Sequence, residues 1–345
     1  MLPIHRRPRV GRIETGQERS LWISSTLTRQ RISSKTSKFI HRFVHRAWIL
    51  GGLGAVGCAN EGPTVDDPRR GVELHVMPFV DTSRPTDAFT DLPASDVRTL
   101  DTWVWLPAGT RTETLHRPVV LMAHGNSGHP EKFVMVAELL AEHGVVVVAP
   151  VFPATNRYGD SAGFAIGDLY EQPEDLDFVR ASLRDEAASR DSVLHERLDV
   201  DRMVAVGHSL GGATVAGWTR WGDAPQTDLL ATVLVAPATF LNGPFGEGPH
   251  PGGPPVQLVH GEDDGTVPLG GSEEMFAAVD GPAALVVFPN VAHSDVIEGE
   301  TSGAYATFEV VRGVVDEVLF GTSTAWGGAL DDAAAAGARV EREGV

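Results

Sequence analysis

From residue 72 onward, the hydrophobic residues are concentrated in short continuous runs separated by polar, Gly-rich and Pro-rich segments. Valine is frequent in these runs, which are too short to be helices. Continuous apolar runs of this length predict strands that are buried on both faces of a sheet. We therefore expect strands at 72–79, 101–105, 119–122, 145–151, 203–206, 231–235, 256–259 and 284–288.

Apolar residues at helical spacing follow most of the later runs, and they predict helices at 131–142, 173–186, 210–220, 272–279 and 303–320. After residue 118, strands and helices alternate, an order typical of a mostly parallel sheet covered on both faces. Residues 71–321 are thus predicted to form one α/β domain with an eight-stranded sheet. Residues 322–345, which include DDAAAAGARVEREG, are predicted to be an exposed Ala-rich tail, helical or disordered.

One junction between a strand and a helix carries a candidate reactive side chain. The segment MVAVGHSLGG (203–212) places Ser209 between Gly207 and Gly211, where the chain must turn from strand to helix. So sharp a turn strains the serine backbone by about 1 to 3 kcal/mol, and such strain persists mainly where function needs it. The glycines allow the strand and the helix to approach closely. Ser209 is predicted to be a nucleophile, and the alternative is a serine that only caps the helix.

A serine nucleophile needs a general base and an acid that orients this base. Both residue types follow along the chain. The segment HGEDDGTVPL puts Asp263 and Asp264 at the end of one predicted strand, and PNVAHSDV puts His293 after the last predicted strand. The order serine, aspartate, histidine is the one found in α/β hydrolases. His293 is therefore predicted to be the general base.

These residues resemble the α/β-hydrolase superfamily, and within it the predicted dienelactone-hydrolase and platelet-activating-factor-acetylhydrolase-like esterases of bacteria. The resemblance covers about residues 70–320 and implies an α/β-hydrolase fold with no large inserted cap. It is carried by TWVWLPAG (102–109), VVLMAHGNSGHPEKF (119–133), VVVVAP (145–150), EDLDFVRASL (174–183), VGHSLGG, HGEDDGTVP and the AHS around His293.

The resemblance also implies roles for further residues. In that family the acid lies three residues after the glycine of a strand-end HG and precedes x-x-V-P, which gives Asp264; Asp263 remains the alternative. The oxyanion of the reaction would accept hydrogen bonds from the backbone N–H of Leu210, after the nucleophile, and of Asn126, after the His-Gly pair. His208, inside the turn, is expected to be structural.

The sequence predicts no cofactor and no metal. His124 and His129 flank the loop that contains Asn126, but no H-E-x-x-H or paired C-x-x-C spacing accompanies them. The pairs of neighbouring aspartates do not match a calcium loop, and GGLG near residue 51 lies in a targeting segment.

Two long loops are expected beside the site, at 152–172 and 236–255. The second loop is too rich in Gly and Pro for a helical lid, so we expect an open site that favours short to medium acyl chains. The aromatic residues of the first loop either line a shallow pocket or fix the loop to the core. They are Phe152, Tyr158, Phe164 and Tyr170.

The predicted reaction is the hydrolysis of carboxylic esters, small or polymeric, through an acyl-serine intermediate. Dienelactone is a doubtful substrate, because that activity in the family uses a cysteine nucleophile where this chain has Ser209. A serine peptidase or amidase on the same fold is one alternative. A non-catalytic surface lipoprotein is the other, because fold alone does not separate these classes.

Charge divides the chain into two parts. Residues 1–60 hold 11 of the 28 Lys and Arg but only 2 of the 46 Asp and Glu, so residues 61–345 carry a net charge of −27. A surface so acidic disfavours nucleic acid and other polyanions as partners.

The N-terminal part contains an apolar run, AWILGGLGAVG (47–57), which follows basic residues and ends at Cys58, the only cysteine in the chain. This run is too short to span a bilayer but has the length of a signal-peptide core. It resembles a bacterial lipoprotein signal. We therefore expect residues 1–58 to be a basic leader and signal, with translation starting at or near Val44, Cys58 to be lipidated and residues 59–70 to be a linker. The protein is expected to be exported and anchored to the cell envelope, or otherwise secreted.

Overall fold

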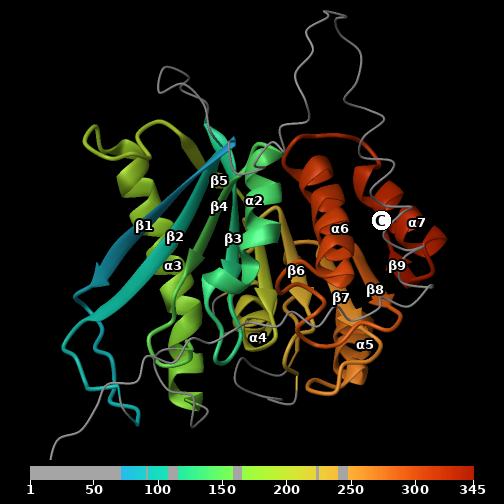
Figure 1. Cartoon of the computed structure of the whole chain (residues 1–345), viewed down its shortest axis with the longest axis horizontal. Coiled ribbons are helices and arrows are strands. Elements are labelled where there is room, and N and C mark those ends of the chain that lie inside the picture. Colours follow the sequence, from blue (N-terminus) through green and yellow to red (C-terminus); the bar gives the residue numbers. More distant parts are fainter. Residues whose placement is uncertain (1–70, 91, 108–115, 158–164, 223–224, 240–247) are drawn as a thin grey trace, which may run out of the picture.

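The structure is a computed structural model that describes residues 71–90, 92–107, 116–157, 165–222, 225–239 and 248–345. Within these residues, nine strands form one mixed sheet in the order β1-β2-β4-β3-β5-β6-β7-β8-β9 (Figure 1). The prediction of a mostly parallel α/β sheet is confirmed, because β3 to β8 run parallel to one another. The antiparallel strands β1 and β9 are the two edge strands, and β2, which is antiparallel to both neighbours, lies between β1 and β4.

The strands lie where the apolar runs predicted them, with one addition at the C-terminal end. Their bounds are β1 Val72–Asp81, β2 Arg98–Pro107, β3 Arg117–Ala123, β4 Val146–Pro150, β5 Leu198–His208, β6 Ala231–Val235, β7 Val256–Gly261, β8 Ala283–Phe288 and β9 Arg339–Glu343.

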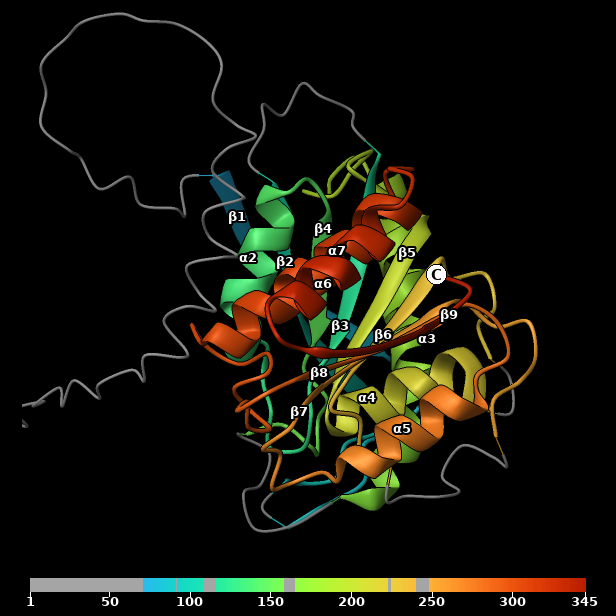
Figure 2. The same cartoon turned by 90° about the vertical axis from the view of Figure 1, so that its right-hand side faces the viewer.

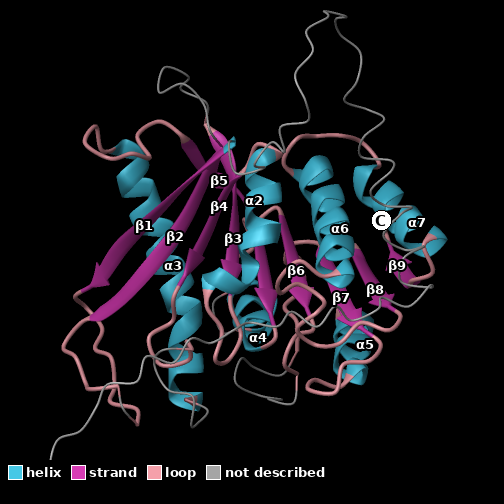
Figure 3. Ribbon diagram, in the orientation of Figure 1, coloured by secondary structure: helices cyan, strands magenta, loops and turns pink. Residues whose placement is uncertain are grey.

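Helices connect the strands and cover both faces of the sheet, as Figure 3 shows by colour. They are the 3-10 turn η2 Pro130–Phe133, α2 Val134–Glu142, α3 Ile166–Ala188, α4 Leu210–Ala216 with its π-helical extension η3 Gly217–Trp221, α5 Leu269–Ala278, α6 Ser302–Val318 and α7 Ala325–Ala335. Seen from the side, α2, α6 and α7 cover one face and α3, α4 and α5 the other (Figure 2). Among the described helices, none is both long enough and apolar enough to cross a bilayer.

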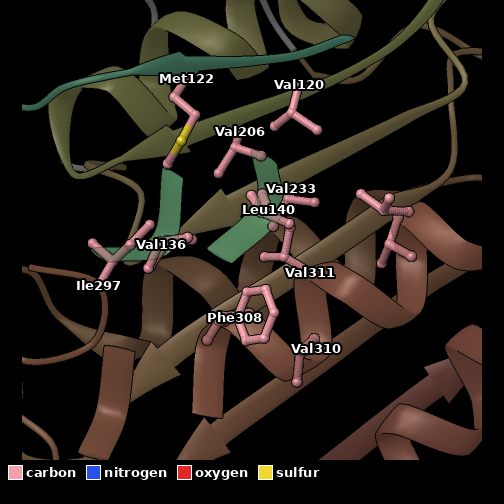
Figure 4. Close-up of a cluster of buried hydrophobic side chains, with 14 of the residues drawn as sticks. Val120, Met122, Val136, Leu140, Val206, Val233, Ile297, Phe308, Val310 and Val311 are labelled. Carbon is pink, nitrogen blue, oxygen red and sulfur yellow. The ribbon is translucent and has the colours of Figure 1, made fainter. Parts of the chain in front are cut away.

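Two apolar layers hold the helices on the sheet. Side chains alternate along each strand, so Val120 and Met122 of β3 face α2 and α6, whereas Val119 and Leu121 belong to the layer beneath α3. The first layer also includes Phe308 of α6 (Figure 4). Burial of both strand faces explains why these strands are continuous apolar runs rather than alternating ones.

The C-terminal segment differs from the exposed tail expected for residues 322–345. It forms α7, which packs on α6, and β9, which pairs with β8 and makes the ninth strand. Trp326 and Leu330 are buried, and the indole N–H of Trp326 donates to the side chain of Gln257 at 2.6 Å. These two apolar residues lie one helical turn apart, so the segment has an apolar face despite its alanine-rich composition. The charges of β9 suit an edge strand exposed to water.

Helix α3 is longer than expected, because it begins at Ile166 and passes through Pro173. Tyr170 therefore lies on a helix and not in a loop. Tertiary contacts offset the unfavourable proline: Asp168 pairs with buried Arg98 at 2.8 Å, and the side-chain amide of Gln172 donates to Thr155 at 2.8 Å. Of the other predicted features, Tyr158, Phe164 and Cys58 lie outside the described residues.

Because β3, β5, β7 and β8 are parallel, their carboxyl ends meet at one edge of the sheet. Open α/β sheets bind their ligands at this edge. Each predicted site residue of the domain follows one of these strands.

Candidate active site

Ser209 lies at the junction of β5 and α4 in a backbone conformation that residues with a side chain rarely adopt. Its φ is 56° and its ψ is −121°, and such a conformation costs on the order of 1 to 3 kcal/mol. Backbone hydrogen bonds hold it in place. The N–H of Ser209 donates to the carbonyl of Val235 at 3.0 Å, and its own carbonyl accepts from Gly212 and Ala238 at 2.9 Å each. The junction is thus the sharp, strained turn that the sequence analysis expected.

The loop after β3 presses closely on this turn. A Cβ atom on Gly211 would lie 2.2 Å from the backbone oxygen of Ala123, which is closer than real atoms approach. A Cβ atom on Gly125 would lie 2.8 Å from Cβ and 3.2 Å from Oγ of Ser209. Glycine at these two positions therefore allows the loop after β3 to lie against the serine hydroxyl.

The loops after β7 and β8 bring Asp264 and His293 together. Nδ1 of His293 lies 2.7 Å from Oδ2 of Asp264, whose Oδ1 accepts the backbone N–H groups of Thr266 and Val267 at 2.8 Å each. The Asp264 side chain is only 1% exposed. Burial opposes its ionisation, but the hydrogen bonds from Val267, His293 and Thr266 outweigh this effect and lower the pKa of Asp264 below its ordinary value. The carboxyl is therefore ionised at neutral pH.

This hydrogen bond determines which nitrogen of His293 accepts a proton. A carboxylate only accepts hydrogen bonds, so Nδ1 of His293 carries a proton, and Nε2 of the neutral ring keeps its lone pair. The alternative acid, Asp263, is exposed, and its backbone N–H donates to the carbonyl of Val291 at 3.0 Å. The structure thus places Asp264, rather than Asp263, at His293.

His208, which precedes Ser209, supports the loop that carries His293. Its Nε2 donates to the backbone carbonyl of His293 at 3.1 Å, and the centroids of the two rings are 4.8 Å apart. Burial, with the charge of His293 when protonated, lowers the pKa of His208 to about 3. His208 is therefore neutral at pH 7, and its contacts agree with the structural role expected for it.

The loop after β3 is fixed by His124, which the sequence analysis considered only as a possible metal ligand. Gly125 and Gly128 close a turn with a hydrogen bond of 2.9 Å, and Nδ1 of buried His124 donates to the same carbonyl of Gly125 at 2.8 Å. Nε2 of His124 accepts the backbone N–H of Phe152 at 3.1 Å. C=O and N–H point in opposite directions across a trans peptide. A fixed Gly125 carbonyl therefore also fixes the direction of the Asn126 N–H.

The second backbone donor named in the sequence analysis, the N–H of Leu210, lies in the first turn of α4. The first N–H groups of a helix have no acceptor within the helix and are available to a ligand. Asn126 and Leu210 thus lie in the two segments that meet at Ser209, although the Asn126 side chain is exposed.

His129, the second histidine at this loop, has a different place. It precedes η2, where its Nδ1 accepts the backbone N–H of Glu131 at 3.3 Å, and its ring packs edge-on against Trp103. Across the described part of the chain, His, Cys, Asp and Glu side chains form no group of three or more that could hold a metal ion.

The comparisons with known proteins agree with this architecture. A 24% identical match, over 62% of this chain and 76% of the relative, is the uncharacterized protein YfhR of Escherichia coli O157:H7; YfhR of strain K12 matches equally. A ferulic acid esterase from Streptomyces cinnamoneus has a similar structure, with a TM-score of 0.56 and 18% identity over 73% of this chain and 91% of that one. At this identity the likeness shows the fold, which is that of the α/β hydrolases.

The family comparison goes further than the fold. The model of the dienelactone hydrolase family matches residues 105–311, from the end of β2 into α6. This match covers more than half of the chain and includes the loops after β3, β5, β7 and β8. The chain therefore belongs to the dienelactone hydrolase family.

Proposed function

We propose that the protein hydrolyses carboxylic esters through an acyl intermediate on Ser209, with His293 as general base and Asp264 as the acid that orients it. The observation that carries the proposal is the 2.7 Å hydrogen bond between Asp264 and His293, at the sheet edge where Ser209 is held in a strained turn. This bond leaves Nε2 of His293 as the acceptor that a serine nucleophile needs. Membership of a hydrolase family supports the same reaction class.

In the first half of the reaction, Nε2 of His293 takes the proton of the Ser209 hydroxyl while Oγ bonds to the ester carbonyl carbon. The carbonyl electron pair moves onto oxygen, and this oxyanion accepts hydrogen bonds from the N–H groups of Leu210 and Asn126. The intermediate then collapses, the bond from carbon to the alcohol oxygen breaks, and the alcohol leaves with the proton from Nε2.

In the second half, water replaces the alcohol. Nε2 of His293 takes a proton from the water, the oxygen bonds to the acyl carbon, and the same two N–H groups stabilise the new oxyanion. When this intermediate collapses, the bond to Oγ breaks and Ser209 recovers its proton from Nε2. Throughout, the Asp264 carboxylate stabilises the imidazolium form of His293 and stays ionised.

We further propose short to medium acyl chains as substrates, because the Gly-rich and Pro-rich segment after β6 is unsuited to a helical lid. An open site buries little of a long chain, and each CH₂ group left in water forgoes about 0.8 kcal/mol of binding. The two long loops lie partly outside the described residues, so this proposal rests on the sequence.

A panel of p-nitrophenyl esters from acetyl to palmitoyl, run beside an anilide panel, tests the function. We expect esters of about two to eight carbons to be hydrolysed fastest, because each CH₂ that stays in water adds no binding. Ser209→Ala should abolish both activity and labelling by a fluorophosphonate, whereas Ser323→Ala, on an exposed segment between α6 and α7, should keep both. Faster cleavage of anilides would indicate an amidase or peptidase. Activity or labelling that persists in Ser209→Ala would contradict the proposed nucleophile.

We also propose that the protein is exported and held at the cell envelope by lipid on Cys58. Acyl chains hold a protein at a membrane by about 0.8 kcal/mol per buried CH₂ group. The full-length protein should therefore sediment with membranes and Cys58→Ser should not. Equal solubility of both forms would reject the lipid anchor and leave secretion.

A further inference from the structure

His260, the last residue but one of β7, is a buried titratable residue that the proposed mechanism does not use. Its side chain is fully buried, and Nε2 lies 3.3 Å from Oδ2 of Asp264 and 3.2 Å from the carbonyl oxygen of Val267. Its other ring nitrogen, Nδ1, lies 2.8 Å from Oγ of Ser272, a buried residue of α5. The polar contacts of His260 thus connect the candidate acid, Asp264, with α5.

The partners of the ring determine where its proton lies. A carbonyl oxygen only accepts, so the contact with Val267 requires a proton on Nε2 of His260. In the neutral ring Nδ1 then has a lone pair, which accepts the hydroxyl proton of Ser272. Burial lowers the pKa of His260, and its contacts with Val267 and Asp264 offset this only in part. The ring is therefore neutral at pH 7, and its single N–H donates to the Val267 carbonyl while Nε2 lies 3.3 Å from Oδ2 of Asp264.

Oδ2 of Asp264 accepts the N–H of His293 at 2.7 Å, and the N–H of His260, which the Val267 carbonyl shares, lies beside it with Nε2 at 3.3 Å. Oδ1 accepts the two backbone N–H groups of Thr266 and Val267. Three hydrogen bonds thus hold this carboxylate, and the shared N–H of His260 adds a weaker contact at Oδ2. The carboxylate therefore cannot rotate away from His293 without losing a hydrogen bond.

We propose that His260 is a positioning residue for the reaction: held in one tautomer by the Val267 carbonyl and in place by Ser272, it keeps Oδ2 of Asp264 directed toward His293. The inference rests on the proposed function, in which Asp264 orients His293. His260 touches neither substrate nor reacting atoms, and it acts through the carboxylate alone. The N–H of His260 also partly compensates the negative charge of Oδ2. It therefore limits how strongly Asp264 stabilises the protonated form of His293.

Two variants of His260 separate the hydrogen bond from simple packing. His260→Leu removes the N–H donor, whereas the amide nitrogen of His260→Gln can still donate from a similar position. A hydrogen bond to a charged group supports a loss of about 10- to 100-fold in kcat for His260→Leu, with KM little changed. His260→Gln should recover most of this loss. The acid limb of the kcat/KM profile should move to higher pH in His260→Leu, because the unshared carboxylate charge favours protonated His293.

Ser272→Ala provides a milder test that leaves His260 in place. Without the hydroxyl, Nδ1 of His260 loses its hydrogen-bond partner and the ring is less well fixed, so we expect kcat to fall about 3- to 10-fold, the worth of a neutral hydrogen bond. The proton magnetic resonance of the Nδ1–H shared by His293 and Asp264 should shift in this variant, which a purely structural role would not cause. Thr102→Val is the matched control: it also removes a buried hydroxyl, but from β2, and four strands lie between β2 and β7.

The outcomes distinguish this inference from the proposed function. Activity that disappears in Ser209→Ala while Ser272→Ala and His260→Leu keep the wild-type kcat and pH profile would overturn the role of His260 alone. An equal loss in His260→Gln and His260→Leu would also overturn it, because the donor would then be irrelevant. Activity that survives in Ser209→Ala would refute the proposed function instead.

Discussion

Asp264 and His293 lie 29 positions apart in the chain, yet Oδ2 of the first is 2.7 Å from Nδ1 of the second. Two neighbouring parallel strands, β7 and β8, end side by side and carry the two residues on the loops that follow. Asp263, one residue earlier, is exposed to solvent. The same backbone thus directs one aspartate to the histidine and its neighbour to water.

The two aspartates should therefore respond very differently to the same substitution. Asp264→Asn should lower kcat by about 10⁴, as in other serine hydrolases, because the amide no longer selects the tautomer or stabilises the imidazolium. Asp263→Asn, which removes the same charge from the exposed neighbour, should stay close to wild type. Steady-state kinetics on a short-chain ester measures both, and the reverse ranking would transfer the role of the acid to Asp263.

Much of this site follows from the sequence, because strand ends are recognisable. The apolar runs before Ser209, Asp264 and His293 predict that these residues share one sheet edge, and the structure places each of them after a parallel strand. The sequence does not show which groups form hydrogen bonds with a buried histidine. His124 directly follows β3, His260 is the last residue but one of β7, and each precedes a glycine. This signal marks their positions but not their hydrogen-bond partners, among which Phe152 and Ser272 come from other segments.

The errors of the sequence analysis have a common origin in tertiary contacts. The composition of residues 322–345 predicts an exposed tail, but Trp326 and Leu330 form an apolar face that is buried against α6. The sequence predicts a helix that starts at Pro173, but contacts of Asp168 and Gln172 extend this helix toward its N-terminus. In each case local propensity was weaker than packing or a buried ion pair.

The role of His124 in the loop after β3 can be tested through kcat. His124→Leu removes the donor to the Gly125 carbonyl and frees the peptide that carries the Asn126 N–H, so kcat should fall by up to about 100-fold, as when an oxyanion donor is lost. In His124→Asn the side-chain amide can replace the Nδ1 donor and should recover part of the rate. His75→Leu, on edge strand β1, is the control. Equal rates for His124→Leu and wild type would reject the role.

A stability prediction concerns the buried ion pairs beneath α3. Arg98 is 2% exposed and donates two hydrogen bonds of 2.6 Å to Asp175, which is fully buried, and one of its nitrogens lies 2.8 Å from Asp168. Arg98→Met leaves both carboxylates without this cation, and removing one partner of a buried pair costs about 3 to 5 kcal/mol. Urea denaturation should show this loss as a lower midpoint.

The control for Arg98 is a surface pair of similar length. Arg184 and Asp201 lie 2.8 Å apart, but their side chains are 53% and 74% exposed. Arg184→Met should change the free energy of unfolding by less than about 1 kcal/mol, because water already solvates both charges. Similar losses in the two variants would contradict the importance of burial.

The last prediction concerns the buried histidines and pH. Burial is the main cause that lowers the pKa of His124 to about 4 and that of His208 to about 3, from an ordinary value of 6.5. Between these values and 6.5, the unfolded chain binds protons that the folded chain does not. The free energy of unfolding must therefore fall as the pH falls through this window. The stability that depends on the neutral buried histidines is fully present above pH 6.5.

Other groups act in the same range, so a variant is needed to isolate His124. Burial raises the pKa values of Asp177 and Glu142, which bind protons more readily in the folded state and oppose the histidines. His124→Asn removes the titration of His124 and leaves the other titratable groups in place. Wild type should therefore lose roughly 2 to 3 kcal/mol more than His124→Asn between pH 7 and 4.5. Urea denaturation at pH intervals of half a unit measures the free energy of unfolding of both proteins as a function of pH. Parallel curves would mean that His124 titrates normally in the folded protein.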